Sequence, residues 1–361
     1  MKRLLTLALV LCLAFTTVAF AAEKDAVVPE ALQKSQLLVT LPDEYVSTPD
    51  GMVIDAEGNL IVACPNFGDL SMPGCVIKID KDLNVTKWFD VPVNAVSGEA
   101  RPMGIDLDAE GNLYIVDNQG WTGAEHTQNQ GRILKATFKD GELDTCIEVA
   151  TGMEHPNGIK VRDGFLYVTQ SCFAPIADPS GKLVSGVYRF PMDAEGIVVT
   201  NSLEDEHLLT TMITENLACQ YGADGLTFDA AGNLYVGNFG DSALHMIKFN
   251  EDGTVASNEV WVQDAENMTT TDGIFYDDAT GNIYVADFSR NALAKVTPEG
   301  VVTRIAQSPD SNGAEGQMDQ PGEPIIWEGK IVMSCFDMVT DDGKINSEHD
   351  LPTTMCWIPV E

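Results

Sequence analysis

The sequence predicts an all-β fold, a six-bladed β-propeller closed by an N-terminal strand that completes the last blade. Three observations predict it. Six segments of similar sequence recur about every 50 residues, each segment reads as short strands joined by tight turns, and no long helical pattern interrupts them. A four-stranded unit repeated at this spacing is typical of a propeller blade.

The six segments share one template. They read TPDGMVIDAEGNLIVAC, RPMGIDLDAEGNLYIVD, HPNGIKVRDGFLYVTQ, GADGLTFDAAGNLYVGN, TTDGIFYDDATGNIYVAD and, more weakly, GEPIIWEGKIVMSC. An alternating stretch such as GLTFD predicts a first strand. Asp-x-x-Gly-Asn then predicts a tight turn, because Gly and Asn tolerate positive φ. Leu-Tyr-Val predicts a second strand, and weaker strands follow, as in ALHMIKF and NEVWVQD.

The two ends of the chain are predicted to close the ring. The sixth unit runs out after its third strand, TMCWIPV, whereas SQLLVTLP near the N-terminus belongs to no blade. We therefore expect SQLLVTLP to be the outer strand of the last blade and residues 22–361 to form a single domain. Two insertions, CFAPIADPSGKLVSG and residues 201–221, are expected to form loops of the third blade.

The first 21 residues predict a signal peptide. Lys2 and Arg3 form a charged start, an apolar run follows, and Ala19-Phe20-Ala21 has the small-x-small pattern of a cleavage site. A membrane anchor is the alternative, but the run is short for a bilayer span. We expect an exported protein, periplasmic or extracellular, that is monomeric and has no membrane contact after cleavage.

Charge and cysteine content add further expectations. The net charge of −34 repels nucleic acid, so we expect no nucleic-acid partner. In an oxidising compartment disulfides are expected, and the strand positions favour Cys64–Cys75 and Cys335–Cys356. Cys172–Cys219 is a third possibility, which would leave Cys146 free. No cysteine spacing is Cys-x-x-Cys, so the sequence does not predict a zinc site.

One residue at the start of each repeat is predicted to face the central channel, because the first strand of every blade lines it. These residues are Asp50, Met103, Asn157, Asp224, Asp272 and Glu323. Carboxylates that converge in this way repel one another unless a cation offsets the repulsion. Oxygen ligands suit calcium before magnesium. The alternative, that Asp before Gly only supports a turn, stays open for Asp272 and is the role we assign to Asp50.

The motifs HPNG, GADG and GExxxW (Gly322, Glu323, Trp327) and the repeats resemble the senescence marker protein/gluconolactonase family of six-bladed propellers. That family is itself similar to the diisopropyl fluorophosphatases, paraoxonases and strictosidine synthases. The resemblance implies a channel calcium, or another divalent cation, held by Asn157, Asp224 and Glu323. Glu323 lies in the last blade rather than the first, which implies a circular permutation. Met103 stands where the family tends to have a further Asn.

The resemblance implies a calcium-dependent hydrolase of a lactone or related ester, acting on a small-molecule substrate. No GxSxG, HExxH or P-loop motif is present to suggest another mechanism. The resemblance favours Asp224 as base or nucleophile, with Asp272 as a second candidate by its place in the ring. We expect Met103, His126 and His155 near the substrate. The alternative function is a non-catalytic NHL-type propeller that binds a ligand or a protein partner.

Four aromatic residues follow second strands of the repeats. They are Trp121, Phe239, Phe288 and Phe336. They could wall a pocket at the channel mouth, although core packing would explain them equally well.

Overall fold

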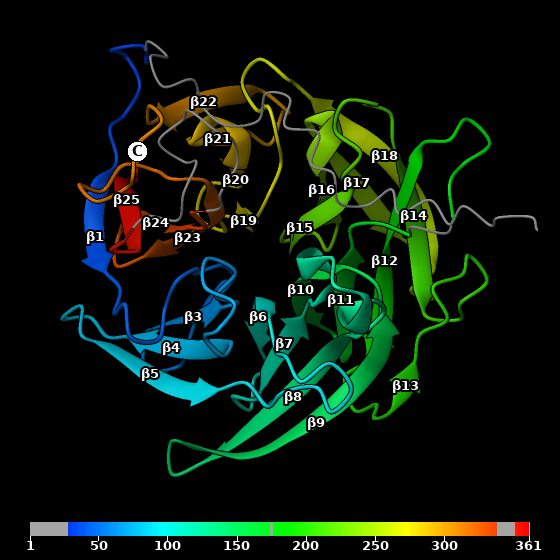
Figure 1. The fold of residues 1–361 in the computed structure, drawn as a ribbon. Coiled ribbons are helices and arrows are strands. Elements are labelled where there is room, and N and C mark those ends of the chain that lie inside the picture. The colour runs from blue at the N-terminus through cyan, green and yellow to red at the C-terminus, as the bar shows by residue number, and fades with distance from the viewer. Residues whose placement is uncertain (1–27, 174–175, 338–350, 361) are drawn as a thin grey trace, which may run out of the picture.

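The computed structural model describes residues 28–173, 176–337 and 351–360, and it is a six-bladed β-propeller (Figure 1). The predicted signal peptide, residues 1–21, lies outside the described residues. Within the described ranges the helices are short 3₁₀ turns, and no helix is long and apolar enough to cross a membrane. The all-β prediction is therefore confirmed.

Each blade is built on four antiparallel strands, of which the first lines the central channel. Blade one contains β2 (Met52–Ile54), β3 (Leu60–Cys64), β4 (Cys75–Ile79) and β5 (Val85–Asp90). Blade two contains β6 (Pro102–Leu107), β7 (Leu113–Asp117), β8 (Gly131–Lys139) and β9 (Glu142–Met153). Blade three contains β10 (Pro156–Arg162), β11 (Phe165–Gln170), β12 (Leu183–Pro191) and β14 (Leu208–Thr214).

The second half of the chain repeats this order. Blade four contains β15 (Ala223–Phe228), β16 (Leu234–Asn238), β17 (Ala243–Phe249) and β18 (Val255–Gln263). Blade five contains β19 (Ile274–Tyr276), β20 (Ile283–Asp287), β21 (Ala292–Val296) and β22 (Val302–Gln307). Blade six contains β23 (Pro321–Trp327), β24 (Lys330–Cys335), β25 (Thr354–Pro359) and the N-terminal β1 (Gln36–Thr40).

The N-terminal strand closes the ring as predicted. β1 pairs antiparallel with β25, with Gln36 opposite Trp357 and Thr40 opposite Thr354. In Figure 1 the blue β1 lies beside the red β25 at the outer edge of blade six. Leu38 is buried there, so the first strand adds apolar packing as well as backbone hydrogen bonds.

One expectation about blade three is wrong. Residues 201–221 are not only an insertion, because they contain β14, the outer strand of that blade. The preceding segment forms β13 (Ile197–Val198), which pairs parallel with β9 and so adds a fifth strand to blade two. The Thr- and Met-containing β14 lacks a clear two-residue alternation in sequence, which explains why it was not recognised.

Two features of the repeat have clear structural causes. In the predicted turns, Asp55 accepts hydrogen bonds from the backbone of Glu57 and Asn59, and Gly58 has φ 84°. Glycine follows five of the six channel residues, Glu323 being followed by Pro324, and it is needed there because neighbouring first strands approach closely. A Cβ on Gly225 would lie 2.6 Å from the backbone oxygen of Asp272 in the next blade.

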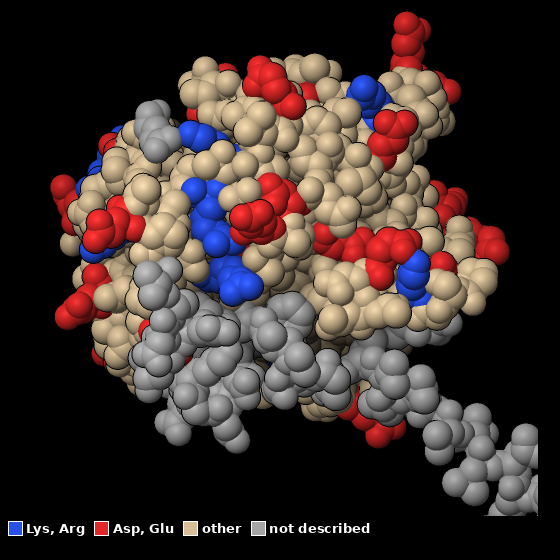
Figure 2. Space-filling model, turned by 90° about the horizontal axis from the view of Figure 1, so that it is seen from above, with Lys and Arg blue, Asp and Glu red and all other residues tan. Residues whose placement is uncertain are grey.

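The core lies between adjacent blades. One cluster joins Val62 and Ile77 of blade one to Val332 and Met355 of blade six, and similar clusters fill the other interfaces. The surface is acidic. Figure 2 shows Asp and Glu side chains at several separate places on the face in view, with fewer Lys and Arg between them.

The seven cysteines within the described ranges are free thiols. Both predicted pairs nevertheless lie close together. Cys64 is directly opposite Cys75 in the ladder of β3 and β4, and the sulfur atoms of Cys335 and Cys356 are 3.7 Å apart. The two disulfides are not formed in this structure, so their existence stays a prediction.

Candidate functional site

The six first strands surround a narrow cavity of about 20 Å³ on the propeller axis. Its polar lining comes from Asp50, Asn157, Lys160, Asp224, Asp272 and Glu323. Five of the six predicted channel residues therefore meet there, and Asn157, Asp224 and Glu323 share one cavity as expected. A space of this size holds a water molecule or a single ion but not a substrate.

Local backbone irregularities aim these side chains into the cavity. The pairing of β10 with β11 shifts register between Pro156 and Ile159, a segment that contains Asn157. The same shift occurs in blade four around Asp224 and in blade six around Glu323. A β-bulge of this kind re-aims a side chain that a regular strand would direct into the sheet, and bulges are common next to active sites.

Three carboxyl groups in the cavity, which we call the channel carboxylates, have no cationic partner among the described residues. They are Asp50, Asp224 and Asp272. Burial and the nearby charge of Glu323 raise the pKa of Asp50 to about 8. Burial and the charge of Asp50 raise the pKa of Asp224 well above its ordinary value. Burial and the charge of Asp224 do the same for Asp272.

Asp50 is therefore not the turn residue that the sequence suggested. Asp55, five positions later, is a true turn aspartate, and hydrogen bonds from Asn59 and the charge of Lys78 overcome its burial and lower its pKa. The Asp50 carboxyl is buried in the channel with a raised pKa, which is the opposite environment. Asp50 thus joins the candidate cation ligands.

Glu323 has partners that the channel carboxylates lack. Its Oε2 accepts a hydrogen bond of 2.7 Å from the backbone of Met52, and its Oε1 lies 3.9 Å from Nζ of Lys160. Burial lowers the pKa of Lys160, but the charges of Asp106 and Glu323 outweigh this effect and raise it overall. Lys160 is therefore a charged lysine inside the channel.

Lys160 and Asp106 are site residues that the sequence reasoning missed. Each lies three positions after the channel residue of its own repeat, a place taken by Val53 in blade one and Ile326 in blade six. Aligning the six repeats at this position would have revealed two charged residues in neighbouring blades.

The donor chemistry of the cavity fits a hard divalent cation. It offers carboxylate oxygens and one amide, and Asn157 donates its Nδ2 to the hydroxyl of Tyr221 at 3.2 Å, which leaves Oδ1 as the atom to bind a cation. Among the described residues, however, the channel carboxylates do not bring three ligand atoms within 4.8 Å of one another. A cation bound among them would need these side chains to move closer together.

A chain of aromatic rings surrounds much of the channel mouth, and we call it the aromatic arc. Neighbouring ring centroids lie 4.8 to 6.1 Å apart along the order Trp121, Tyr221, Phe239, Phe288, Phe336 and Phe67. Five of the six aromatic residues are partly exposed, and Phe336 is buried. The four residues expected to wall a pocket all belong to the arc, so it offers an apolar surface directly beside the cavity.

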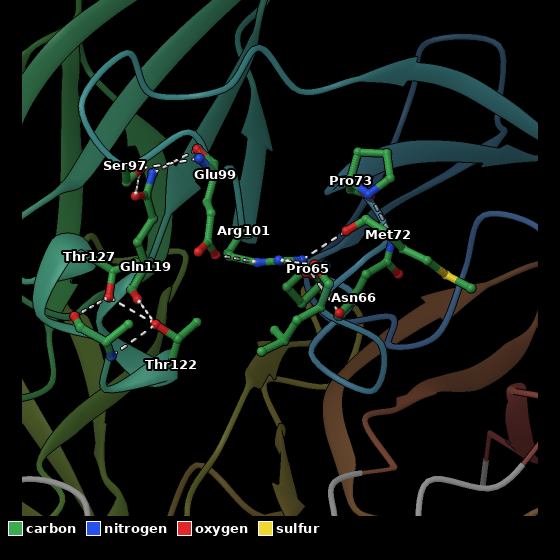
Figure 3. Close-up of polar contacts among 12 residues, drawn as sticks. Pro65, Asn66, Met72, Pro73, Ser97, Glu99, Arg101, Gln119, Thr122 and Thr127 are labelled. Carbon is green, nitrogen blue, oxygen red and sulfur yellow. Dashed lines mark hydrogen bonds and ion pairs between the residues drawn. The ribbon is translucent and has the colours of Figure 1, made fainter.

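Arg101 contacts the loop that carries one end of the arc, and Figure 3 shows it beside Pro65, Met72 and Glu99. Its guanidinium donates to the backbone oxygens of Pro65 and Met72 at 3.0 Å and pairs with Glu99 at 3.3 Å. These contacts hold the loop that carries Phe67, whose ring centroid lies 6.0 Å from the guanidinium. Arg101 is buried, so it supports the loop and is not placed to contact a ligand.

The three predicted substrate residues have different positions. His155 is buried at the mouth, 5.4 Å from the Trp121 ring, and burial lowers its pKa to about 4. His126 lies on the surface, where its Nε2 is 3.0 Å from a Glu99 oxygen. Met103 is 4% exposed and does not line the cavity, because its neighbours Gly104 and Ile105 take that place.

No family model matches the sequence. Over 154 residues the chain is 32% identical to a diisopropyl-fluorophosphatase from Loligo vulgaris, a match that covers 41% of this chain. The matched segment spans 42% of that relative's length. The resemblance inferred from the motifs is confirmed.

Solved structures are similar over most of the chain. A gluconolactonase from Xanthomonas campestris has a TM-score of 0.55 at 14% identity, covering 92% of this chain and 97% of its own. A calcium-binding protein, regucalcin, from Agrobacterium tumefaciens has a TM-score of 0.57 at 12% identity, covering 91% and 94%. At these identities the structures show a shared six-bladed fold, and function must be argued from the site.

Proposed function

We propose that the protein is an exported, calcium-dependent hydrolase of lactones or related esters that carry an apolar acyl or aryl group. One observation carries the proposal. An ion-sized cavity whose channel carboxylates have no cationic partner lies beside a partly exposed aromatic arc, whose Tyr221 accepts a hydrogen bond from Asn157 of the cavity. A cation site beside an apolar binding surface suits an ester with a polar carbonyl and an apolar substituent.

The residues that would hold calcium are Asn157, Asp224 and Glu323, with Asp50 as a further oxygen donor. When bound, the ion would polarise the substrate carbonyl and stabilise negative charge on its oxygen. The similarity to regucalcin, which is described as a calcium-binding protein, supports the choice of ion. The similarity to a fluorophosphatase and a gluconolactonase supports hydrolysis.

The chain's own residues would bind the substrate and move a proton. The aromatic arc would hold the apolar group and exclude water from one side. Asp224 in its ionised form would accept a proton from the attacking water, and Asp272, which lies within hydrogen-bonding reach of Asp224, would pass that proton on toward solvent. Tyr221 would orient Asn157 through its hydroxyl.

The test is a panel of sugar, acyl and aryl lactones, assayed with the mature protein before and after chelation and after calcium is restored. We expect turnover of acyl or aryl lactones above sugar lactones, loss on chelation and recovery with calcium. Asp224→Asn should lower kcat at least about 10²-fold. Asp229→Asn is the matched control, because Asp229 lies in the turn of the same blade and its carboxylate binds Asn233.

Two results would contradict the proposal. Activity that persists in chelated, metal-free protein would remove the role of calcium. Absence of turnover on the whole panel, together with binding of an apolar ligand at the arc, would favour the non-catalytic propeller.

A further inference from the structure

A second group of potential ligands lies beside the channel in blade three. Glu154 and His155 immediately precede β10, and Cys172 follows β11. Their ligand atoms all lie within 4.8 Å of one another. The Cys172 sulfur is 3.2 Å from Nδ1 of His155, and a carboxylate oxygen of Glu154 is 4.0 Å from the same nitrogen. All three residues are at most 9% exposed.

The arrangement is that of a chelate rather than a catalytic relay. In a nucleophile–base–acid relay, the nucleophile and the acid contact opposite nitrogens of the imidazole. Here Cys172 and Glu154 both approach Nδ1. Three different donor atoms that converge on one point leave a position for an ion between them.

The opposite edge of the His155 ring is held by backbone. A Cβ added at Gly120 would lie 2.6 Å from Nε2 of His155, so glycine is required for this approach. The backbone of Gly120 hydrogen-bonds the ring, and Trp121 packs against it. Metal-binding histidines commonly donate their second ring N–H to a backbone carbonyl, which orients the first nitrogen toward the metal.

We propose that Glu154, His155 and Cys172 bind a zinc ion at the edge of the channel mouth. Sulfur, imidazole nitrogen and carboxylate oxygen form a donor set that zinc accepts and calcium does not. Ligand atoms around a tetrahedral zinc ion, at bond lengths near 2.0–2.3 Å, lie about 3.3–3.6 Å apart. The observed separations of 3.2 and 4.0 Å bracket this range. On binding, the Cys172 thiol releases its proton to solvent as the zinc–sulfur bond forms.

The cysteine spacing does not predict a zinc site, because Cys172 is far from Glu154 and His155 in the sequence and meets them only in the fold. The ligands come from the ends of two neighbouring strands, because Ser171 donates its backbone N–H to the oxygen of His155 at 2.9 Å. This pairing sets Cys172 beside His155. The same strand ends carry Asn157, so the zinc site would lie next to the proposed calcium site without sharing a ligand.

The test uses the full mature protein, stripped of metal under reducing conditions, with Zn²⁺ and Co²⁺ as probes. Zinc should bind with one equivalent in competition with a chromophoric chelator. Cobalt should give a thiolate-to-metal charge-transfer absorption, which carboxylate sites cannot produce. Cys172→Ser should abolish the absorption and weaken zinc binding at least about 10-fold, and Glu154→Gln should weaken it less. Cys146→Ser, on the outer strand of blade two, is the matched control and should change neither.

Two outcomes would overturn the proposal. One is the absence of a charge-transfer band in wild-type protein loaded with cobalt, a measurement that needs no variant to fold. The other is zinc binding that Cys172→Ser leaves unchanged, because the ion would then lie on the channel carboxylates. Zinc-dependent protection of Cys172 from alkylation, mapped by mass spectrometry, should accompany binding if the proposal is right.

Discussion

Calcium is expected to stabilise the folded protein through the channel, and single neutralising substitutions test which carboxylates take part. The variants are Asp50→Asn, Asp224→Asn and Glu323→Gln. Asp55→Asn is the control, since it also removes an aspartate carboxylate from blade one, but from a turn rather than from the channel. Only the folded ring holds the carboxylates together, so a cation that binds among them stabilises the native state selectively.

The magnitude follows from linkage and chain length. At free calcium of about 100 times the dissociation constant, the gain in unfolding free energy is roughly 2.7 kcal/mol. A chain of 361 residues has an unfolding entropy of about 0.76 kcal/mol/K, at roughly 2.1 cal/mol/K per residue. The expected rise in Tm is therefore about 4 °C. Asp224→Asn should abolish this rise, because Asp224 is the residue that the cavity and the motif both identify.

Comparing the Asp50 and Glu323 variants tests the calcium site more stringently than the Asp224 variant alone. Glu323 already has a backbone donor and Lys160, whereas Asp50 has a raised pKa and no cation. We expect Asp50→Asn to reduce the calcium-dependent rise in Tm at least as much as Glu323→Gln. The assay is calorimetric or fluorescence melting of metal-free protein titrated with calcium. A flat wild-type curve would refute the calcium site, and an undiminished rise in Asp50→Asn would refute the role of Asp50.

Three further predictions concern the fold. Starting the mature chain at residue 43 removes β1 and with it buried Leu38 and Leu41, so unfolding free energy should fall by at least about 4 kcal/mol, measured in urea; unchanged stability would disprove the closure. Oxidised, exported protein should show a Cys335–Cys356 disulfide in non-reducing peptide maps, and free alkylation of both thiols would contradict it. Burial raises the pKa of Asp205, but hydrogen bonds from Thr200 and the backbone of His207 outweigh this effect and hold the pKa below 3.8. The ionised carboxylate therefore stabilises the fold above about pH 4 and loses this effect as pH falls through the lowered pKa. The stability gap between wild type and Asp205→Asn should shrink at acid pH, and a gap independent of pH would be inconsistent with this account.

The repeat pattern was sufficient to predict the fold because it is local. Alternation, turn residues and spacing identify the blades, and the unpaired first strand identifies the closure. The pattern could not separate two aspartates of the same blade. Asp50 and Asp55 lie five residues apart, and only the assembled ring places one in the channel lining and leaves the other in a turn.

The aromatic arc shows a second limit of reasoning from repeats. In blade three the aromatic residue that follows the second strand is Phe173, but it is buried and packs near Tyr188 in the core. Its place in the arc is taken by Tyr221, which comes from the loop after β14. Tyr221 occupies the place in the arc that the residue after the second strand occupies in the other blades. It comes from a different part of the repeat, so an alignment of the repeats could not identify it.

Charge balance along the channel connects these observations. Lys160 is the one lysine or arginine that lines the cavity in the described structure, and it is paired with Glu323 and Asp106. That leaves the three channel carboxylates, of which Asp224 and Asp272 share a hydrogen bond. The raised pKa values of all three favour their protonated forms in the metal-free channel, and a divalent cation among them would favour the ionised forms instead. Replacing Asp50 with Asn would remove one of the three carboxylates that a cation could ionise, which is why a residue assigned to a turn by its sequence becomes a decisive position for metal binding.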